Sequence, residues 1–357
     1  MKSRLLYLSA SLAVVGLLTS ISSTTAEAAG SCPGPKPESI VVNASGGAMA
    51  KAMRKAFSSD FEKIHGIRVV DTSPANFGKL KAMVESKNVE WTVTEIGGQD
   101  VLKAVEQGLL ERIDGKIVDR SGFPEKAKNL EFWFAKSAFA TVLGYSTKAF
   151  PKNHPKTWAD FWDVKKFPGP RSLRNHPIDN LEYALMADGV APDKLYPLDV
   201  DRAFKKLDEI APNIAVWWKS GAQPAQLLVD GEVVLASGWN GRFFNLIKDN
   251  APLEIEWGQG VIKLSAYGIP KGSPHPCWAQ RYLAVMTDAK RQAVYADEIG
   301  YPGLHLDSPK YVNPKLAKYL PTHPDNISNL IWTDIGWWKD NGKAVHERWN
   351  RWMLKHQ

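Results

Sequence analysis

Apolar residues recur along the chain with two periods, and the order of these periods predicts an α/β fold. Short apolar, β-branched runs predict strands at residues 40–44, 67–71 and 91–96. Each run precedes a segment of helical period, at residues 48–64, 79–84 and 100–107. Strands that alternate with helices in this way predict a parallel sheet with helices on both faces.

The second part of the chain continues with further strands and helices and ends on an aromatic helix. Strands are predicted at residues 138–145 and 262–269, and helices at residues 180–186, 201–210, 278–287 and 291–299. Near the carboxyl terminus, Trp338, Val345, Trp349 and Trp352 are spaced by seven, four and three residues. This spacing places them on one face of a helix, and we expect that face to pack into the core.

Residues 217–242 contain the pattern that is most informative about function. They predict a helix at 223–229, a strand at 232–237 and a loop at 238–242. Open α/β sheets bind ligands in loops that follow the carboxyl ends of buried strands. This loop carries the indole of Trp239, the amide of Asn240 and the guanidinium of Arg242, without a nucleophile or an acid–base pair. It therefore predicts ligand binding rather than catalysis.

The amino terminus has the pattern of a secretory signal. Lys2 and Arg4 precede an apolar run at residues 5–21, and small residues follow up to Ala28. We expect cleavage after Ala28 and export of the remaining chain. The chain has a net charge of +7, but its basic residues are interleaved with acidic ones and form no run. This distribution argues against nucleic-acid binding.

The exported part is longer than one hydrophobic core usually covers, which predicts two lobes. It contains two cysteines, Cys32 and Cys277, which we expect to form a disulfide in an oxidising compartment. Two unlinked thiols are one alternative, and a lipid-anchored Cys32 is another. Residues 29–31 lack the leucine that normally precedes a lipid-anchored cysteine.

Several short motifs, in a fixed order, resemble those of one transport family. They are Ser45-Gly46-Gly47-Ala48, residues 144–146, the segment PKTWADFW at 155–162, Gly231-Glu232-Val233 before Trp239-Asn240-Gly241, residues 269–272 and residues 300–302. Together they resemble the periplasmic solute-binding proteins of ABC importers, in the branch that includes spermidine/putrescine binders. The resemblance covers nearly the whole chain after residue 28.

The resemblance implies a type II periplasmic binding protein fold, with two α/β lobes whose mixed sheets are joined by crossover strands. We expect lobe 1 to comprise residues 29–139 and 268–305, and lobe 2 residues 140–267 and 306–357, including the carboxyl-terminal helix. The resemblance also implies a periplasmic monomer without a cofactor. Such a protein binds a small molecule between the lobes and delivers it to permease subunits in the inner membrane.

The residues at the expected ligand positions favour an anion over a polyamine. Where the polyamine branch carries an acid and an aromatic residue, this chain has Ser265 and Lys263. Arginines occur nearby, Arg242 after the 232–237 strand and Arg174 beside Arg171 in another strand, and a guanidinium binds carboxylates well. Glycine-rich helix starts also favour anions. We therefore predict that the ligand is a small organic anion, a carboxylate, bound by the residues Ser45, Gly46, Gly47, Gly97, Gly98, Arg174, Trp239, Asn240, Arg242, Ser265 and Tyr267.

Other functions remain open at this point. A polyamine, diamine or ω-amino acid is compatible with the same fold if Asp179, Glu95 or Glu256 replaces the lost acids. A zwitterion would then use one such carboxylate together with Arg242. A secreted enzyme and a ferric-ion binder are further alternatives. The chain, however, lacks serine-hydrolase, zinc-protease and phosphate-loop motifs, and its tyrosines and histidines are scattered.

Overall fold

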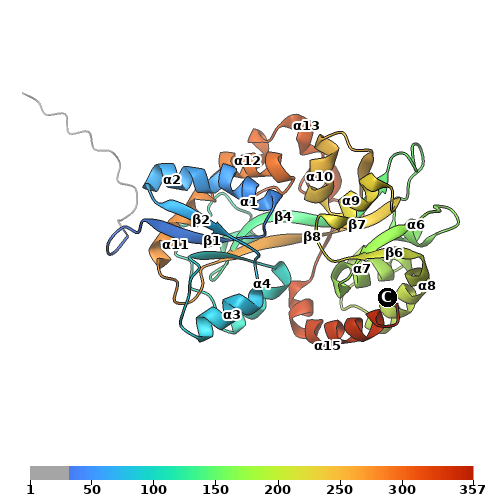
Figure 1. Cartoon of the computed structure of the whole chain (residues 1–357), viewed down its shortest axis with the longest axis horizontal. Coiled ribbons are helices and arrows are strands. Elements are labelled where there is room, and N and C mark those ends of the chain that lie inside the picture. Colours follow the sequence, from blue (N-terminus) through green and yellow to red (C-terminus); the bar gives the residue numbers. More distant parts are fainter. Residues whose placement is uncertain (1–31, 357) are drawn as a thin grey trace, which may run out of the picture. The chain divides into compact units, whose positions relative to one another are not determined.

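A computed structural model of the protein describes residues 32–356, and Figure 1 shows its helices and strands. The predicted signal sequence and its cleavage site lie outside the described residues. The described strands are β1 (Ser39–Asn43), β2 (Arg68–Thr72), β3 (Val93–Ile96), β4 (Phe134–Ser146), β5 (Arg171–Arg174), β6 (Ile214–Trp218), β7 (Leu235–Trp239), β8 (Leu253–Gly268) and β9 (Ile331–Trp332). Most of them begin and end within a few residues of the predicted runs, because burial selects the same apolar residues that produce the pattern.

The described strands form one nine-stranded mixed sheet in the order β2-β1-β3-β8-β4-β7-β5-β6, with β9 beside β8. β1 pairs in parallel with β2 and β3, and β5 pairs in parallel with β6 and β7. The parallel pairing predicted from the first three strands is therefore confirmed, and β8 runs antiparallel between β3 and β4. The predicted fold class, α/β with mixed strand directions, is confirmed.

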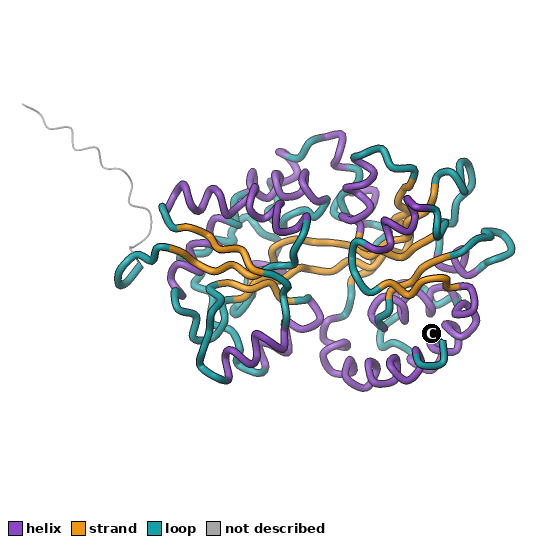
Figure 2. The backbone as a smooth tube through the Cα atoms, in the orientation of Figure 1, coloured by secondary structure: helices purple, strands orange, loops and turns teal. Residues whose placement is uncertain are grey.

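Helices cover both faces of the sheet, as predicted (Figure 2). Figure 1 shows α1, α2 and α12 on one face and α3 and α15 on the other. The helices are α1 (Ala48–Met53), α2 (Ser59–His65), α3 (Phe77–Glu85), α4 (Gly98–Glu106), α5 (Glu125–Lys128), α6 (Trp158–Trp162), α7 (Pro177–Ala187), α8 (Val200–Ile210), α9 (Gln223–Asp230), α10 (Asn240–Lys248), α11 (Pro276–Val285), α12 (Ala289–Ile299), α13 (Pro314–Ala317), α14 (Pro324–Ile327) and α15 (Ile335–Met353). A π-helical turn at Arg54–Ser58 joins α1 to α2.

The two longest strands, β4 and β8, connect separate hydrophobic clusters. Phe134 at the start of β4 belongs to a cluster built around β1, β3 and α11. Tyr145 near the end of β4 belongs to another cluster, built around α7, α8 and α15. Strands that pass from one cluster to the other have the arrangement expected of crossover strands. The exact lobe boundaries stay a prediction.

The segment predicted as a loop at residues 238–242 is instead the junction of a strand and a helix. Gly238 and Trp239 pair with β4 as the last residues of β7, and α10 begins at Asn240. Gly238 allows close packing here, since a Cβ atom at this position would lie 2.5 Å from the ring of Phe243. The glycine therefore serves helix–strand packing, which its sequence neighbours do not reveal.

The aromatic face of α15 packs into the core, as its spacing predicts. Trp338, Val345, Trp349 and Trp352 are all buried. The indole N–H groups of the tryptophans are also satisfied, because Trp338 donates to Glu182, Trp349 to Asn175 and Trp352 to Asp208. The helix is thus attached to the preceding helices by both apolar and polar contacts.

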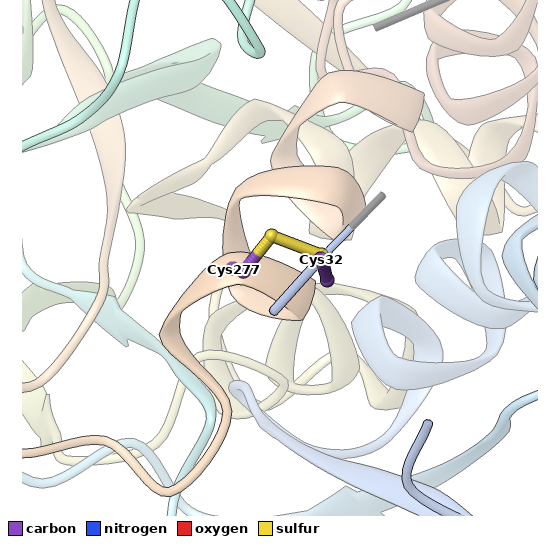
Figure 3. The surroundings of a disulfide bond; sticks show 2 residues. All are labelled: Cys32 and Cys277. Carbon is purple, nitrogen blue, oxygen red and sulfur yellow. A yellow bond between two sulfur atoms is a disulfide. The ribbon is translucent and has the colours of Figure 1, made fainter. Parts of the chain in front are cut away.

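The predicted disulfide is confirmed (Figure 3). Cys32 and Cys277 are bonded, with their Cα atoms 5.6 Å apart and a separation of 245 positions in sequence. The bond attaches the beginning of the described chain to α11. Neither unlinked thiols nor a lipid-anchored Cys32 is therefore the arrangement in this structure.

Candidate ligand-binding site

A cavity of about 250 Å³ lies where several strands end. This volume is below the roughly 300–1,000 Å³ that is usual for drug-sized ligands, so the cavity suits a small metabolite. Its lining residues are Ser45, Met49, Ala75, Asn76, Phe77, Leu80, Glu95, Ile96, Gly97, Gly98, Asp100, Phe139, Arg174, Ile178, Trp239, Lys263, Ser265 and Tyr301.

The topology of the sheet explains why these residues meet. Ser45 follows β1, Gly97 follows β3, and Arg174 and Trp239 are the last residues of β5 and β7. Each of these four strands pairs in parallel with a neighbouring strand, and the carboxyl ends of parallel strands form the usual ligand site of an open α/β sheet. β8 adds Lys263 and Ser265, whose spacing of two places both on one face of the strand.

One wall of the cavity carries a buried acid, Glu95. Its Oε1 atom accepts hydrogen bonds from Ser265 Oγ at 2.7 Å and from Lys136 Nζ at 3.2 Å, and its Oε2 atom accepts one from the Ser45 N–H at 2.7 Å. Burial opposes ionisation, but the Lys136 ammonium and the hydrogen-bond donors outweigh it. The pKa of Glu95 therefore lies below its ordinary value.

The start of α4 lies on the same wall. Gly97 and Gly98 line the cavity, and Gly98 must be small because a Cβ atom there would lie 2.7 Å from the Leu264 carbonyl oxygen. A bare helix start of this kind would favour an anion. Asp100 in the first turn of α4 also lines the cavity, however, and together with Glu95 it makes this wall acidic.

A second buried ion pair lies beside Phe139, whose ring centroid is 5.6 Å from Lys263 Nζ. Lys263 Nζ contacts Asp179 Oδ1 and donates to Thr141 Oγ1 at 2.8 Å, and Thr141 Oγ1 also donates to Asp179 Oδ2 at 2.8 Å. Asp179 has φ of 77°, in the left-handed region that is uncommon for a residue other than glycine. Such strained residues concentrate at functional sites. Here the strain accompanies a kink that turns Ile178 and Asp179 away from the axis of α7.

Arg174 differs from the two lysines because it has no anionic partner in contact. Its guanidinium lies 5.5 Å and 5.4 Å from the ring centroids of Trp218 and Trp239. Within the described part of the chain it makes no ion pair and no side-chain hydrogen bond. Burial lowers the pKa of Arg174, but an arginine stays protonated in any protein environment. Arg174 is therefore a fixed cation with all its donors available to a ligand.

Aromatic side chains form the apolar part of the cavity. The ring of Phe139 meets that of Trp239 at a centroid distance of 6.3 Å and that of Tyr301 at 5.8 Å. Phe77 lines the cavity as well. These rings give the cavity an apolar surface of low dielectric, which strengthens electrostatic contacts with a bound ligand.

The cavity brings together six of the predicted ligand residues, Ser45, Gly97, Gly98, Arg174, Trp239 and Ser265. The other five lie beside or beneath it. Gly46 and Gly47 follow Ser45, and Gly47 is the N-cap of α1. Asn240 faces the interior, where its amide binds the Gly300 carbonyl and the Ala140 N–H.

Tyr267 and Arg242 are also outside the set of lining residues. Tyr267 is fully buried, and its ring lies 5.2 Å from Lys136 Nζ. Arg242 lies in the first turn of α10, half-buried and close enough to Tyr301 to affect the pKa of its hydroxyl. Among the other candidate residues, Arg171 donates to the carbonyls of Phe161 and Phe167, and Glu256 pairs with His154.

The sequence analysis did not identify Lys136, Phe139, Thr141 and Tyr301 as site residues. Lys136 carries a recognisable signal, because it is the single charged residue in an otherwise uncharged strand. A charged residue that is buried in this way must be paired, which makes it a candidate for a functional network. The aromatic residues carry no such signal, since their type is equally common in a core.

Within residues 32–356, no group of three or more His, Cys, Asp or Glu side chains is arranged to hold a metal ion. None of the helices in that part of the chain is both long and apolar enough to cross a membrane.

Comparison with known families identifies the class of protein to which this fold and cavity belong. The model of the family of bacterial extracellular solute-binding proteins matches residues 53–321, and the chain belongs to this family. The predicted resemblance to solute-binding proteins of ABC importers is thereby confirmed. Proteins of this class bind small molecules and deliver them to permeases, and the relatives are transport proteins rather than enzymes.

Two similar proteins are named for different ligands. The γ-aminobutyric acid (GABA)-binding protein of Pseudomonas aeruginosa is 33% identical over 328 residues, which cover 89% of this chain and 92% of that protein. The spermidine/putrescine-binding periplasmic protein of Escherichia coli is 24% identical over 297 residues, with 77% and 82% covered. The chain is thus more similar to the GABA binder than to this polyamine binder.

Solved structures show the same fold. An ABC transporter substrate-binding protein from Bradyrhizobium japonicum is 40% identical, with a TM-score of 0.84 over 88% of this chain and 99% of that one. A GABA receptor structure is 35% identical, with a TM-score of 0.82 over 89% of this chain and 98% of that one.

Proposed function

We propose that the protein is the periplasmic solute-binding component of an ABC importer, and that its ligand is a small ω-amino acid such as GABA. The ω-amino acids are one of the ligand classes that the sequence left open, and such a ligand carries both the predicted carboxylate and an amine. The observation that carries the proposal is the unpaired Arg174 guanidinium, which shares one small cavity with the acidic wall at Glu95. The names of the GABA-binding relatives support it.

Arg174 suits the carboxylate end of such a ligand. A guanidinium presents a planar fork of donors that matches the two oxygens of a carboxylate. The Trp218 and Trp239 rings hold the guanidinium in place, so little rotational freedom is lost on binding. Lys263 is less suited to this role, because Asp179 and Thr141 already accept two of its three N–H groups.

Glu95 suits the amine end. Its Oε2 atom accepts one hydrogen bond, from the Ser45 N–H, which leaves acceptor capacity for an ammonium group. Asp100 adds negative charge at the same wall. The buried acids Glu95 and Asp179 are balanced by the buried bases Lys136 and Lys263. Such a balanced site suits a ligand that carries one charge of each sign.

The spacing of two residues on β8 favours a short ligand. Ser265 contacts Glu95, and Lys263 contacts Asp179. These two residues of β8 are two positions apart, which corresponds to about 7 Å along a strand. The methylene groups of a bound ω-amino acid would lie against Phe139 and Trp239, which line the cavity between the ends.

The location and the partner follow from the same proposal. Export through the predicted amino-terminal signal would place the protein in the periplasm as a monomer. There it would deliver its ligand to the permease subunits of an importer in the inner membrane, without a cofactor and without a chemical step.

Titration calorimetry with the exported chain and GABA tests the proposal. Arg174→Met should weaken GABA binding at least tenfold, about 1.4 kcal/mol, because it removes the cation that meets the carboxylate. Arg242→Met is the matched control, since Arg242 is a second arginine near the site that does not line the cavity, and should change Kd by less than twofold. The opposite pattern would reject the proposed site. No binding of GABA or of longer ω-amino acids by the wild type would reject the ligand class.

A further inference from the structure

We propose that Lys136 determines the ligand specificity of this cavity: by neutralising Glu95 from behind, it excludes amines that lack a carboxylate. The inference rests on the proposed function, since it takes the cavity as the ligand site. Lys136 does not line the cavity and would act through Glu95, as a positioning and charge-setting residue.

A local irregularity of the sheet places Lys136 at Glu95. In the pairing of β4 with β8, Ala135 lies opposite Ala266 and Ser137 lies opposite Ser265. Lys136 is therefore an extra residue on β4, without a partner on β8. A β-bulge of this kind changes the direction of a side chain and is frequent next to functional sites. Without the bulge, β4 would have no extra residue at this position whose side chain could contact Glu95.

The contacts of Lys136 are all internal. Its side chain has no exposed surface, and its Nζ atom donates to Glu95 Oε1 at 3.2 Å and to Tyr295 Oη at 2.9 Å. Nζ also lies 3.3 Å from Met49 Sδ and 4.9 Å from the centroid of the Tyr295 ring. The ammonium is thus held at one oxygen of Glu95, and the other oxygen is left for the cavity side.

A buried lysine is a costly way to fill this space. Both charges of the pair lose hydration, and replacement of buried ion pairs by apolar residues is often neutral or stabilising. The pair is therefore poorly explained by stability alone. Its electrostatic effect on the cavity is clear, however, because it keeps Glu95 ionised as a hydrogen-bond acceptor while cancelling its net charge.

This cancellation distinguishes between ligands that share an ammonium group. A zwitterionic ω-amino acid adds no net charge to the balanced site, whereas a monoamine adds one positive charge and a diamine adds two. With Lys136 present, the added charge has no counterpart, and Arg174 repels the second ammonium of a diamine. Without Lys136, the site would carry one negative charge, which a cationic amine would neutralise.

The test compares GABA with 4-aminobutyramide, which keeps the ammonium group and has a neutral amide in place of the carboxylate. Calorimetry is performed on the wild-type exported chain and on the variants Lys136→Gln and Lys136→Met. The ratio of Kd for the amide to Kd for GABA should fall at least tenfold in both variants. Lys136→Arg should retain the wild-type ratio, and Glu95→Gln added to Lys136→Gln should restore it.

A pH series separates this role from a structural one. In Lys136→Gln, binding of the amide should weaken between pH 7 and pH 5, because Glu95 has lost the cation that keeps it ionised. In the wild type the ratio should be constant over this range. Loss of packing alone would lower both affinities together and leave their ratio unchanged.

The outcomes are distinguishable. If folded Lys136→Gln has the wild-type ratio, the inference is wrong, whatever the absolute affinities. If the wild type does not bind GABA, the proposed function fails, whereas a gain of amide binding in Lys136→Gln would still support the role of Lys136. If both neutral variants fail to fold, the variant Glu95→Gln, with Lys136 intact, replaces them. This variant should improve binding of glutarate relative to GABA at least tenfold. An unchanged preference between these two ligands would overturn the inference.

Discussion

The ion pair between Lys263 and Asp179 offers a quantitative test of how the cavity is held together. The side chain of Asp179 is fully buried and that of Lys263 is 8% exposed. Removing one partner of such a pair leaves the other charge buried and costs about 3–5 kcal/mol, whereas removing both often costs little. Asp179→Asn and Lys263→Met should therefore each lower the free energy of unfolding by about 3 kcal/mol, and the double variant by less than their sum.

Urea unfolding, followed by tryptophan fluorescence, measures these free energies. The interaction energy from the double-mutant cycle should be at least about 2 kcal/mol. The exposed pair of Lys79 and Glu90, with side chains 52% and 60% exposed, is a matched control, and Glu90→Gln should cost less than about 1 kcal/mol. Strictly additive effects of Asp179→Asn and Lys263→Met would refute the reasoning, because they would show that the two charges do not compensate each other.

Two further predictions concern the disulfide and the acidic wall. Replacing Cys32 and Cys277 by serine should lower the free energy of unfolding, measured by urea unfolding, by about 3–5 kcal/mol, because the bond closes a long loop. The same replacement should leave ligand affinity, measured by calorimetry, unchanged. Glu95 has a pKa below its ordinary value of 4.5, so its contributions to stability and to amine binding should be complete above pH 4.5 and be lost only as the pH falls through the lowered pKa. Loss of GABA affinity already between pH 6 and pH 5 would contradict this.

Much of the fold is encoded in local patterns, and these patterns were sufficient to predict it. The strands near residues 40–44 and 67–71 and the helix with Trp338 and Trp349 result from burial of one face, which leaves a periodic trace. The position of β8 between β3 and β4 leaves no such trace, because antiparallel pairing between distant segments depends on the whole sheet. For this reason the first strands suggested a parallel sheet.

The cavity contains only part of the set of ligand residues that the sequence predicted. Arg174 and Arg242 both occur at the junction of a strand and a helix, so the residue type is the same in both. Whether the guanidinium of Arg242 faces the cavity depends on where β7 ends and where α10 begins. The start of α10 at Asn240 puts Arg242 on a helix beside the cavity. Likewise, the bulge that brings Lys136 to Glu95 is a property of strand register, which one sequence does not display.

The central claim is that a small zwitterion lies between Arg174 and Glu95, and a crystal structure of the protein with GABA tests it most directly. The account predicts that both carboxylate oxygens of the ligand lie about 3 Å from the guanidinium nitrogens of Arg174. Its ammonium nitrogen should lie at a similar distance from Glu95 Oε2. A carboxylate bound at Arg242, or a ligand outside this cavity, would contradict the account.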